Sequence, residues 1–109
     1  FDQFQRIYYH WAEINRVAMD ALAALPADRT LFTRLEDLSQ SPDKVLALFD
    51  FLGLPFSESH AAVFARPHNV NRPEDKLLND TQRSQFEAIA TGMMARLGYA
   101  GTPEYLVSY

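Results

Sequence analysis

The sequence predicts a mainly α-helical fold, with four helices and one or two short strands, in a single compact unit over residues 1–109. Apolar residues recur at three- and four-residue steps along most of the chain, which is the period of amphipathic helices. Ser, Asn, Pro and Gly stand at the ends of these runs, where helices begin and end. The 48% content of hydrophobic residues is enough for a core and excludes the composition of disordered proteins.

The first predicted helix starts near Phe4 and ends before Pro26. Trp11 and Tyr8 could form a platform that stacks on a nucleic-acid base, but their helical spacing favours packing in the core. The predicted core face of this helix consists of Phe4, Ile7, Tyr8, Trp11, Ile14, Ala18, Ala21, Leu22 and Leu25.

Residues 29–34 are predicted to form a strand, because they are rich in β-branched and aromatic residues and follow a turn. In this extended segment Arg34 and Glu36 would point to the same face and could form an ion pair, with Asp37 where the chain turns. The alternative is a direct catalytic role for Glu36. A lone strand leaves its backbone groups unpaired. A partner chain, the C-terminal tail or another part of the same protein is therefore expected to pair with it.

A second helix is predicted between Ser41, a suitable N-cap, and Gly53, which can adopt the left-handed conformation that ends a helix. Pro42 suits its first position. The apolar residues from Val45 to Leu52 surround more than one side of this helix, which predicts burial on two sides.

Two further helices complete the prediction. A short one follows the cap Ser57 and runs through about Ala65, and the last starts at Asn79 or Asp80 and stops at Gly98. Residues 66–78 lie between them and form the longest predicted loop.

The net charge of −4 argues against a nucleic-acid-binding protein, because phosphate affinity needs clustered Lys and Arg. No apolar run is long enough to cross a bilayer, so no membrane association is expected. The absence of cysteine suits a reducing compartment, and a cytoplasmic location is expected. The three histidines lack the spacing of metal ligands. Because Phe1 already lies within a helical pattern, the chain is interpreted as trimmed or partial.

No glycine-rich phosphate-binding loop occurs in the sequence, so no nucleotide enzyme is complete within it. Residues 59–83 are nevertheless the only long stretch in which acidic residues do not outnumber basic ones. The basic residues there are Arg66, Arg72, Lys76 and Arg83.

Several short motifs, in a fixed order, resemble the C-terminal part of bacterial-type sulfotransferases that use 3'-phosphoadenosine-5'-phosphosulfate. The first two are Arg34-Leu35-Glu36-Asp37-Leu38 and Ser41-Pro42. Phe51-Leu52-Gly53-Leu54-Pro55 follows, and Met93-Met94-Ala95-Arg96-Leu97-Gly98-Tyr99 is similar to the closing helix of that family. The resemblance covers residues 8–99.

The resemblance implies the C-terminal part of a P-loop-like α/β domain, whose phosphosulfate loop and catalytic base lie upstream of Phe1. It implies 3'-phosphoadenosine-5'-phosphosulfate as the donor and a small-molecule or saccharide acceptor in the complete protein. Arg72, Arg66 and Lys76 would contact the donor phosphate, and Arg34 and Glu36 would support the scaffold. No catalytic residue is expected in this chain. The Arg-Lys-Gly sequence of the cytosolic family members is absent from this chain. The alternative to phosphate contact is a solvated loop, in which the basic residues offset the charges of Glu74 and Asp75.

A second hypothesis requires no cofactor. The chain would be a stand-alone helical interaction module, in which the aromatic residues of the first helix bind a partner protein or a second copy in a homo-oligomer.

Overall fold

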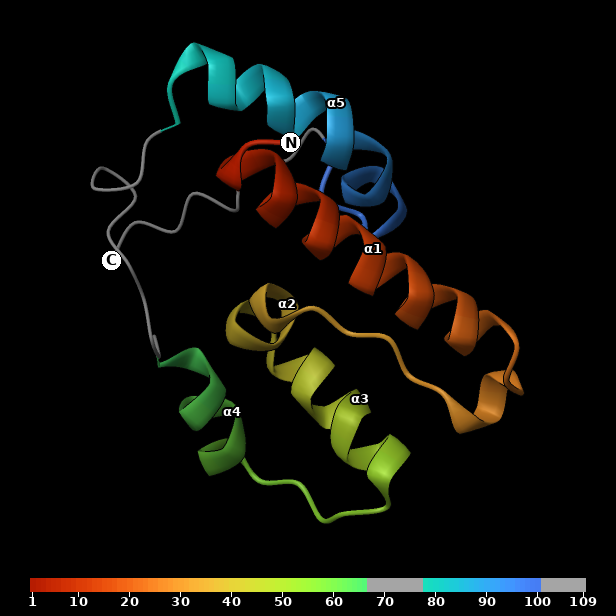
Figure 1. The fold of residues 1–109 in the computed structure, drawn as a ribbon. Coiled ribbons are helices and arrows are strands. Elements are labelled where there is room, and N and C mark those ends of the chain that lie inside the picture. Colours follow the sequence, from red (N-terminus) through yellow and green to blue (C-terminus); the bar gives the residue numbers. More distant parts are fainter. Residues whose placement is uncertain (67–77, 101–109) are drawn as a thin grey trace. The chain divides into compact units, whose positions relative to one another are not determined.

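The computed structural model describes residues 1–66 and 78–100, and within these residues the fold is mainly α. The four predicted helices are confirmed: α1 (Gln3–Ala23), α3 (Pro42–Leu52), α4 (Glu58–Ala65) and α5 (Asp80–Arg96). A further short helix, α2 (Leu35–Gln40), and the 3-10 turn η1 (Ala27–Arg29) lie between α1 and α3 (Figure 1).

The strand predicted over residues 29–34 is wrong for the described part of the chain, which contains no strand. The backbone is extended at Thr30 (φ −130°, ψ 144°) and again at Arg34 (φ −103°, ψ 143°). An extended segment becomes a strand only when a neighbouring segment completes its hydrogen-bond ladder, and no described segment does so. Immediately after Arg34, the chain enters α2.

The end of α3 is fixed by a glycine, as predicted. Gly53 has φ 68° and ψ 27°, in the left-handed region. The N–H of Leu54 donates to the carbonyl of Phe49 at 2.9 Å, and that of Gly53 donates to the carbonyl of Asp50 at 3.1 Å. These two bonds form a Schellman motif, which satisfies carbonyls at the helix end.

The expectation that α3 would be buried on two sides is wrong in this structure. Val45 is fully buried, whereas Leu46 and Leu52 are exposed. The apolar residues surround the helix, but within the described residues of the second unit only the side with Val45 is buried.

The start of α5 also follows its prediction. The Asn79 side chain accepts from the N–H of Gln82 at 2.8 Å, and the Gln82 side chain accepts from the N–H of Asn79 at 3.0 Å. This reciprocal arrangement is a capping box. At the other end Gly98 has φ 82°, and the N–H of Tyr99 donates to the carbonyl of Met94.

The described residues divide into two units, one of residues 1–25 and 78–100 and the other of residues 26–66. One compact unit over the whole chain stays a prediction. In the first unit α1 and α5 lie side by side (Figure 1). Gln85 donates to Asp2 at 2.7 Å near the start of α1, and Arg96 donates to Asp20 at 2.7 Å near its end. The two helices therefore run in the same general direction.

The core of the first unit is small. Tyr8 of α1 packs edge-on against Phe86 of α5, with ring centroids 5.3 Å apart, and Ala90 and Leu97 are buried. The predicted core face of α1 is right for Tyr8 but wrong for Ile7 and Ile14 in this structure, since each is 54% exposed. Within the described residues of the first unit, the side of α1 that α5 covers is the one that carries Tyr8.

The second unit packs α2, α3 and α4 together. Leu38 of α2 and Val45 of α3 are its buried residues. Phe49 of α3 lies against the ring of His60 on α4, with centroids 4.6 Å apart, and against Phe56 at 5.9 Å. Aromatic contacts thus join the end of α3 to α4.

Candidate functional site

The first of the three residues predicted to contact phosphate lies at the end of α4. Arg66 is the C-cap residue of that helix, is exposed, and makes no ion pair with any residue in the described ranges. Arg72 and Lys76, the other two predicted contacts, lie outside the described residues. The structure therefore places one of the three side chains.

The family-like motif at residues 34–38 is organised by a bidentate ion pair. The Arg34 Nε and Nη2 atoms donate to the two carboxylate oxygens of Asp37, each at 2.9 Å. The two hydrogen bonds lower the pKa of the Asp37 carboxyl. The sequence predicted Glu36 as the partner on the premise of an extended backbone. That premise is wrong, because residues 35–40 are helical and Asp37 lies one turn after Arg34.

The helix N-termini of the described chain are already supplied with negative charge. Asp2 caps α1, and acidic residues occupy the first turns of the other four helices: Glu36 and Asp37, Asp43, Glu58, and Asp80. These carboxylates complement the positive ends of the helix dipoles. A phosphate placed at any of these N-termini would meet an acidic side chain nearby, which disfavours anion binding there.

A groove of about 410 Å³ lies between α3 and α4 in the second unit. Its lining is largely apolar and includes Leu46, Phe56 and Ala62. The charged residues that line it are Asp43 and Glu58, which are both acidic. Their charge makes the groove unsuitable for a phosphate or sulfate group, although Leu46 and Phe56 would suit an apolar group.

Helix α1 has three distinct faces. The inner face meets α5 and comprises Gln5, Tyr8, Ala12, Asn15, Met19 and Leu22, all buried or half-buried. The charged face carries Arg6, Glu13, Arg16 and Asp20. The outer face consists of Gln3, Phe4, Ile7, His10, Trp11, Ile14, Val17, Ala18 and Ala21.

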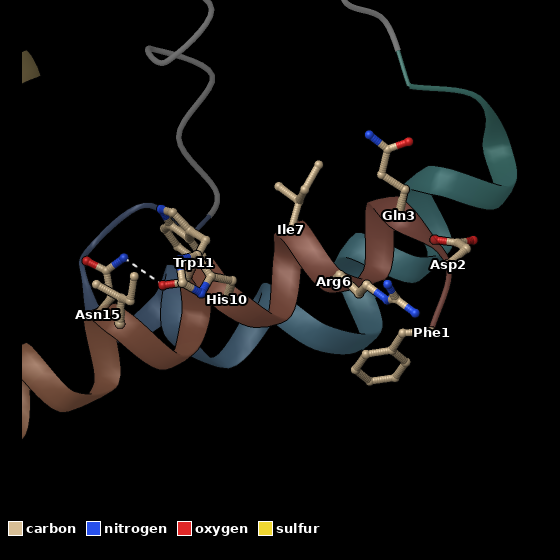
Figure 2. Close-up of a pocket in the computed structure, with 9 residues that line it drawn as sticks. Phe1, Asp2, Gln3, Arg6, Ile7, His10, Trp11 and Asn15 are labelled. Atoms are coloured by element: carbon tan, nitrogen blue, oxygen red, sulfur yellow. Dashed lines mark hydrogen bonds between the residues drawn. The ribbon is translucent and has the colours of Figure 1, made fainter.

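The outer face carries no formally charged side chain and is largely uncovered. All its residues are exposed except Trp11, which is half-buried. Several of them, such as Ile7 and Trp11, line a groove of about 830 Å³ on α1, which the charged residues Asp2 and Arg6 also line (Figure 2). Asn15 donates to the backbone carbonyl of Trp11 at 2.8 Å, which holds its amide beside the groove. A continuous uncharged surface of this kind favours an apolar partner.

The charged face of α1 forms an ion-pair network that reaches α5. Arg16 pairs with Glu13 and, at 2.9 Å, with Asp20, and Asp20 also pairs with Arg96 of α5. The hydrogen bond from Arg96 is the largest cause that lowers the pKa of Asp20, and that from Arg16 lowers the pKa of Glu13. These exposed pairs orient α1 on α5 but contribute little free energy individually.

Within residues 1–66 and 78–100 no group of three or more His, Cys, Asp or Glu side chains could hold a metal ion. No helix of these ranges is both long and apolar enough to span a bilayer.

In the comparisons with known proteins, no family model, no curated protein and no solved structure matches the chain.

The sequence prediction did not separate the outer face of α1 from its core face, although the second hypothesis left aromatic residues of this helix exposed. Positions 4, 7, 11, 14, 18 and 21 and positions 5, 8, 12, 15, 19 and 22 form two parallel seven-residue patterns. Both patterns lack charged residues, so the helix has two sides that can be buried. The single core face predicted from periodicity combined residues of both.

Proposed function

We propose that this chain is the C-terminal portion of a sulfotransferase. The complete enzyme would transfer a sulfuryl group from 3'-phosphoadenosine-5'-phosphosulfate to a hydroxyl or amine acceptor, and this portion would be inactive alone. The order of the four short motifs along the sequence carries the proposal. The complete protein would act in the cytoplasm on a small molecule or saccharide.

The roles of the motif residues in the structure support a scaffolding function for this portion. Arg34 and Asp37 form an ion pair at the start of α2. Pro42 begins α3, and Gly53 ends it. The three motifs that hold these residues lie within the second unit, and the fourth, over residues 93–99, lies in the first. In this structure these residues fix the path of the backbone, and the Asp37 carboxylate is held by Arg34, which agrees with a supporting part of a larger domain.

Donor binding would need groups from outside this chain. A bisphosphate requires convergent backbone amides as well as cations, and the N-termini of the described helices carry acidic residues instead. Arg66, Arg72 and Lys76 would add positive charge to a phosphate cradle supplied by upstream sequence. Sulfuryl transfer would then proceed in line, with the upstream groups stabilising the developing charge electrostatically.

Calorimetric titration with 3'-phosphoadenosine-5'-phosphate tests this function. We expect the 109-residue chain to bind no tighter than the high micromolar range, and the protein with its natural upstream sequence to bind clearly. In the extended protein, Arg72→Ala should weaken binding about tenfold or more, since a charge-assisted phosphate contact is lost. Arg29→Ala removes an exposed arginine of η1 and should leave the affinity unchanged.

Two outcomes would contradict the proposal. The first is an extended protein that shows no binding at all. The second is tight binding by the 109-residue chain alone, which would mean that the cradle lies within it.

The alternative function, a stand-alone helical interaction module, is favoured by the outer face of α1. This face is uncharged, largely exposed and continuous over the helix. It requires no cofactor and no additional domain.

A further inference from the structure

We propose that the start of α4 is a pH-sensitive helix cap, in which neutral His60 accepts a hydrogen bond from the backbone N–H of Ser57 and protonation of the ring breaks that bond. This inference is independent of the proposed sulfotransferase activity, because it uses neither the motif residues nor the predicted phosphate contacts.

The position of His60 gives its ring the role of a capping group. His60 is the third residue of α4, where a capping box usually has Glu or Gln. Its Nδ1 atom lies 3.0 Å from the backbone nitrogen of Ser57, and because that nitrogen is a donor, Nδ1 must accept. A histidine whose Nδ1 accepts is uncharged and carries its proton on Nε2. The geometry therefore requires the neutral Nε2–H form of His60.

Two phenylalanine rings hold the imidazole in this orientation. The ring of His60 lies against Phe49 of α3, with centroids 4.6 Å apart, and near Phe56, with centroids 6.3 Å apart. The His60 residue is half-buried among these contacts. Packed neighbours restrict the rotation of a side chain, so Nδ1 stays directed at Ser57.

Charged side chains do not supply His60 with another strong contact. Helix α4 packs against α2 and α3, and within the described residues no ion pair joins His60 to a carboxylate on any of the three helices. Asp37 pairs with Arg34 instead. The hydrogen bond from Ser57 is thus the contact of the ring that depends on its protonation. The charged residues of α2, α3 and α4 are Glu36, Asp37, Asp43, Lys44, Asp50 and Glu58.

Protonation converts Nδ1 from an acceptor into a donor, so the ring and the Ser57 N–H would be two donors facing each other. The imidazolium would also lie at the positive end of the helix dipole. The effect stays local for two reasons. Ser57 Oγ lies 3.3 Å from Nδ1 and can accept from the protonated ring, and Ser57 is exposed, so water can solvate the released N–H.

Nitrogen NMR of the isotope-labelled 109-residue chain tests the neutral state. At about pH 8, above the range in which histidine ordinarily titrates, His60 should have a proton on Nε2 and none on Nδ1. A scalar coupling between the Ser57 amide nitrogen and Nδ1 should be observed, because it passes through the N–H···N hydrogen bond. A proton on Nδ1 at this pH would overturn the proposal.

Titration to about pH 5 tests the switch, since carboxyl groups ordinarily titrate at lower pH than histidine. The coupling should disappear as the His60 ring is protonated, and the Ser57 amide proton should shift upfield in step with it. Survival of the coupling on a protonated ring would overturn the proposal, and this measurement needs no variant.

His60→Gln is the matched variant, because glutamine is a usual capping-box residue and does not titrate. Its Ser57 amide should keep the hydrogen-bonded shift at both pH values. His10→Gln removes an exposed histidine of α1 and should leave the Ser57 titration as in the wild type. An equal shift of the Ser57 amide in His60→Gln and in the wild type would show that another group causes it, which would also overturn the proposal.

Discussion

At the scale of single residues, the pair of Arg34 and Asp37 determines how the chain enters α2. Arg34 precedes the helix and reaches forward by one turn, so that its guanidinium holds both oxygens of the carboxylate. The side chains are 21% and 31% exposed, which partly shields the pair from water. A bidentate pair in such surroundings stabilises a structure more than a single exposed contact does.

Arg34→Ala is expected to lower the free energy of unfolding by about 1–2 kcal/mol, because two charge-assisted hydrogen bonds are lost and Asp37 is left without this partner. Arg34→Lys should have an intermediate effect, since lysine keeps the charge but cannot form the planar fork. Urea unfolding followed by circular dichroism measures both. Arg66→Ala is the control and should change stability by less than about 0.5 kcal/mol. Equal stability of the wild type and Arg34→Ala would contradict this assignment.

At the scale of elements, the ends of the helices depend on a few residues with special backbone or capping properties. Gly53 ends α3 in the left-handed conformation, and a Cβ atom built on it meets nothing within 4 Å. Any cost of a side chain there therefore comes from the backbone conformation alone.

Gly53→Ala should destabilise the protein by about 1 kcal/mol, because a left-handed conformation is unfavourable for alanine. Gly92 lies inside α5, and a Cβ atom there also meets nothing within 4 Å. Gly92→Ala should stabilise by about 0.5–1 kcal/mol, since alanine favours helix. Thermal unfolding of the two variants compares the same chemical change at two backbone conformations. Effects of the same sign would show that backbone conformation does not govern the difference.

The sequence predicted the helix boundaries well because caps and stops act locally, as at Pro42, Gly53 and Asn79. It missed α2, which is one short stretch with a single buried residue, Leu38, and no side-chain cap. A strand was expected before it because β-branched residues favour extended backbone, but a strand depends on a distant partner. The outer face of α1 was assigned to the core for a similar reason, since periodicity shows which residues share a face but not what covers it. Of the candidate phosphate site, only Arg66 lies in the described ranges.

At the scale of the whole molecule, carboxylates with lowered pKa values couple the fold to pH. Hydrogen bonds lower the pKa of Asp2, Glu13, Asp20 and Asp37 in the folded chain. The unfolded chain therefore binds more protons than the folded chain at acidic pH. The resulting stabilisation is complete above the unfolded pKa values and is lost as the pH falls through the folded ones.

The denaturation midpoint in urea should therefore be nearly constant from about pH 7 to pH 5 and fall below about pH 4. Asp37→Asn cannot titrate at that position, so it should be less stable than the wild type at pH 7 and lose less stability on acidification. Urea titrations at several pH values and constant ionic strength measure the effect. A wild-type midpoint at pH 3 equal to that at pH 7 would exclude the linkage.

The contact of α1 with α5 has a consequence during protein synthesis. Residues 3–23 leave the ribosome before their partner over residues 80–96 is made. At usual translation rates the intervening residues take several seconds to produce, and throughout that time both the Tyr8 side and the Ile14 side of the nascent helix face water. A chaperone that recognises apolar segments would therefore have a binding site on this helix until α5 is made.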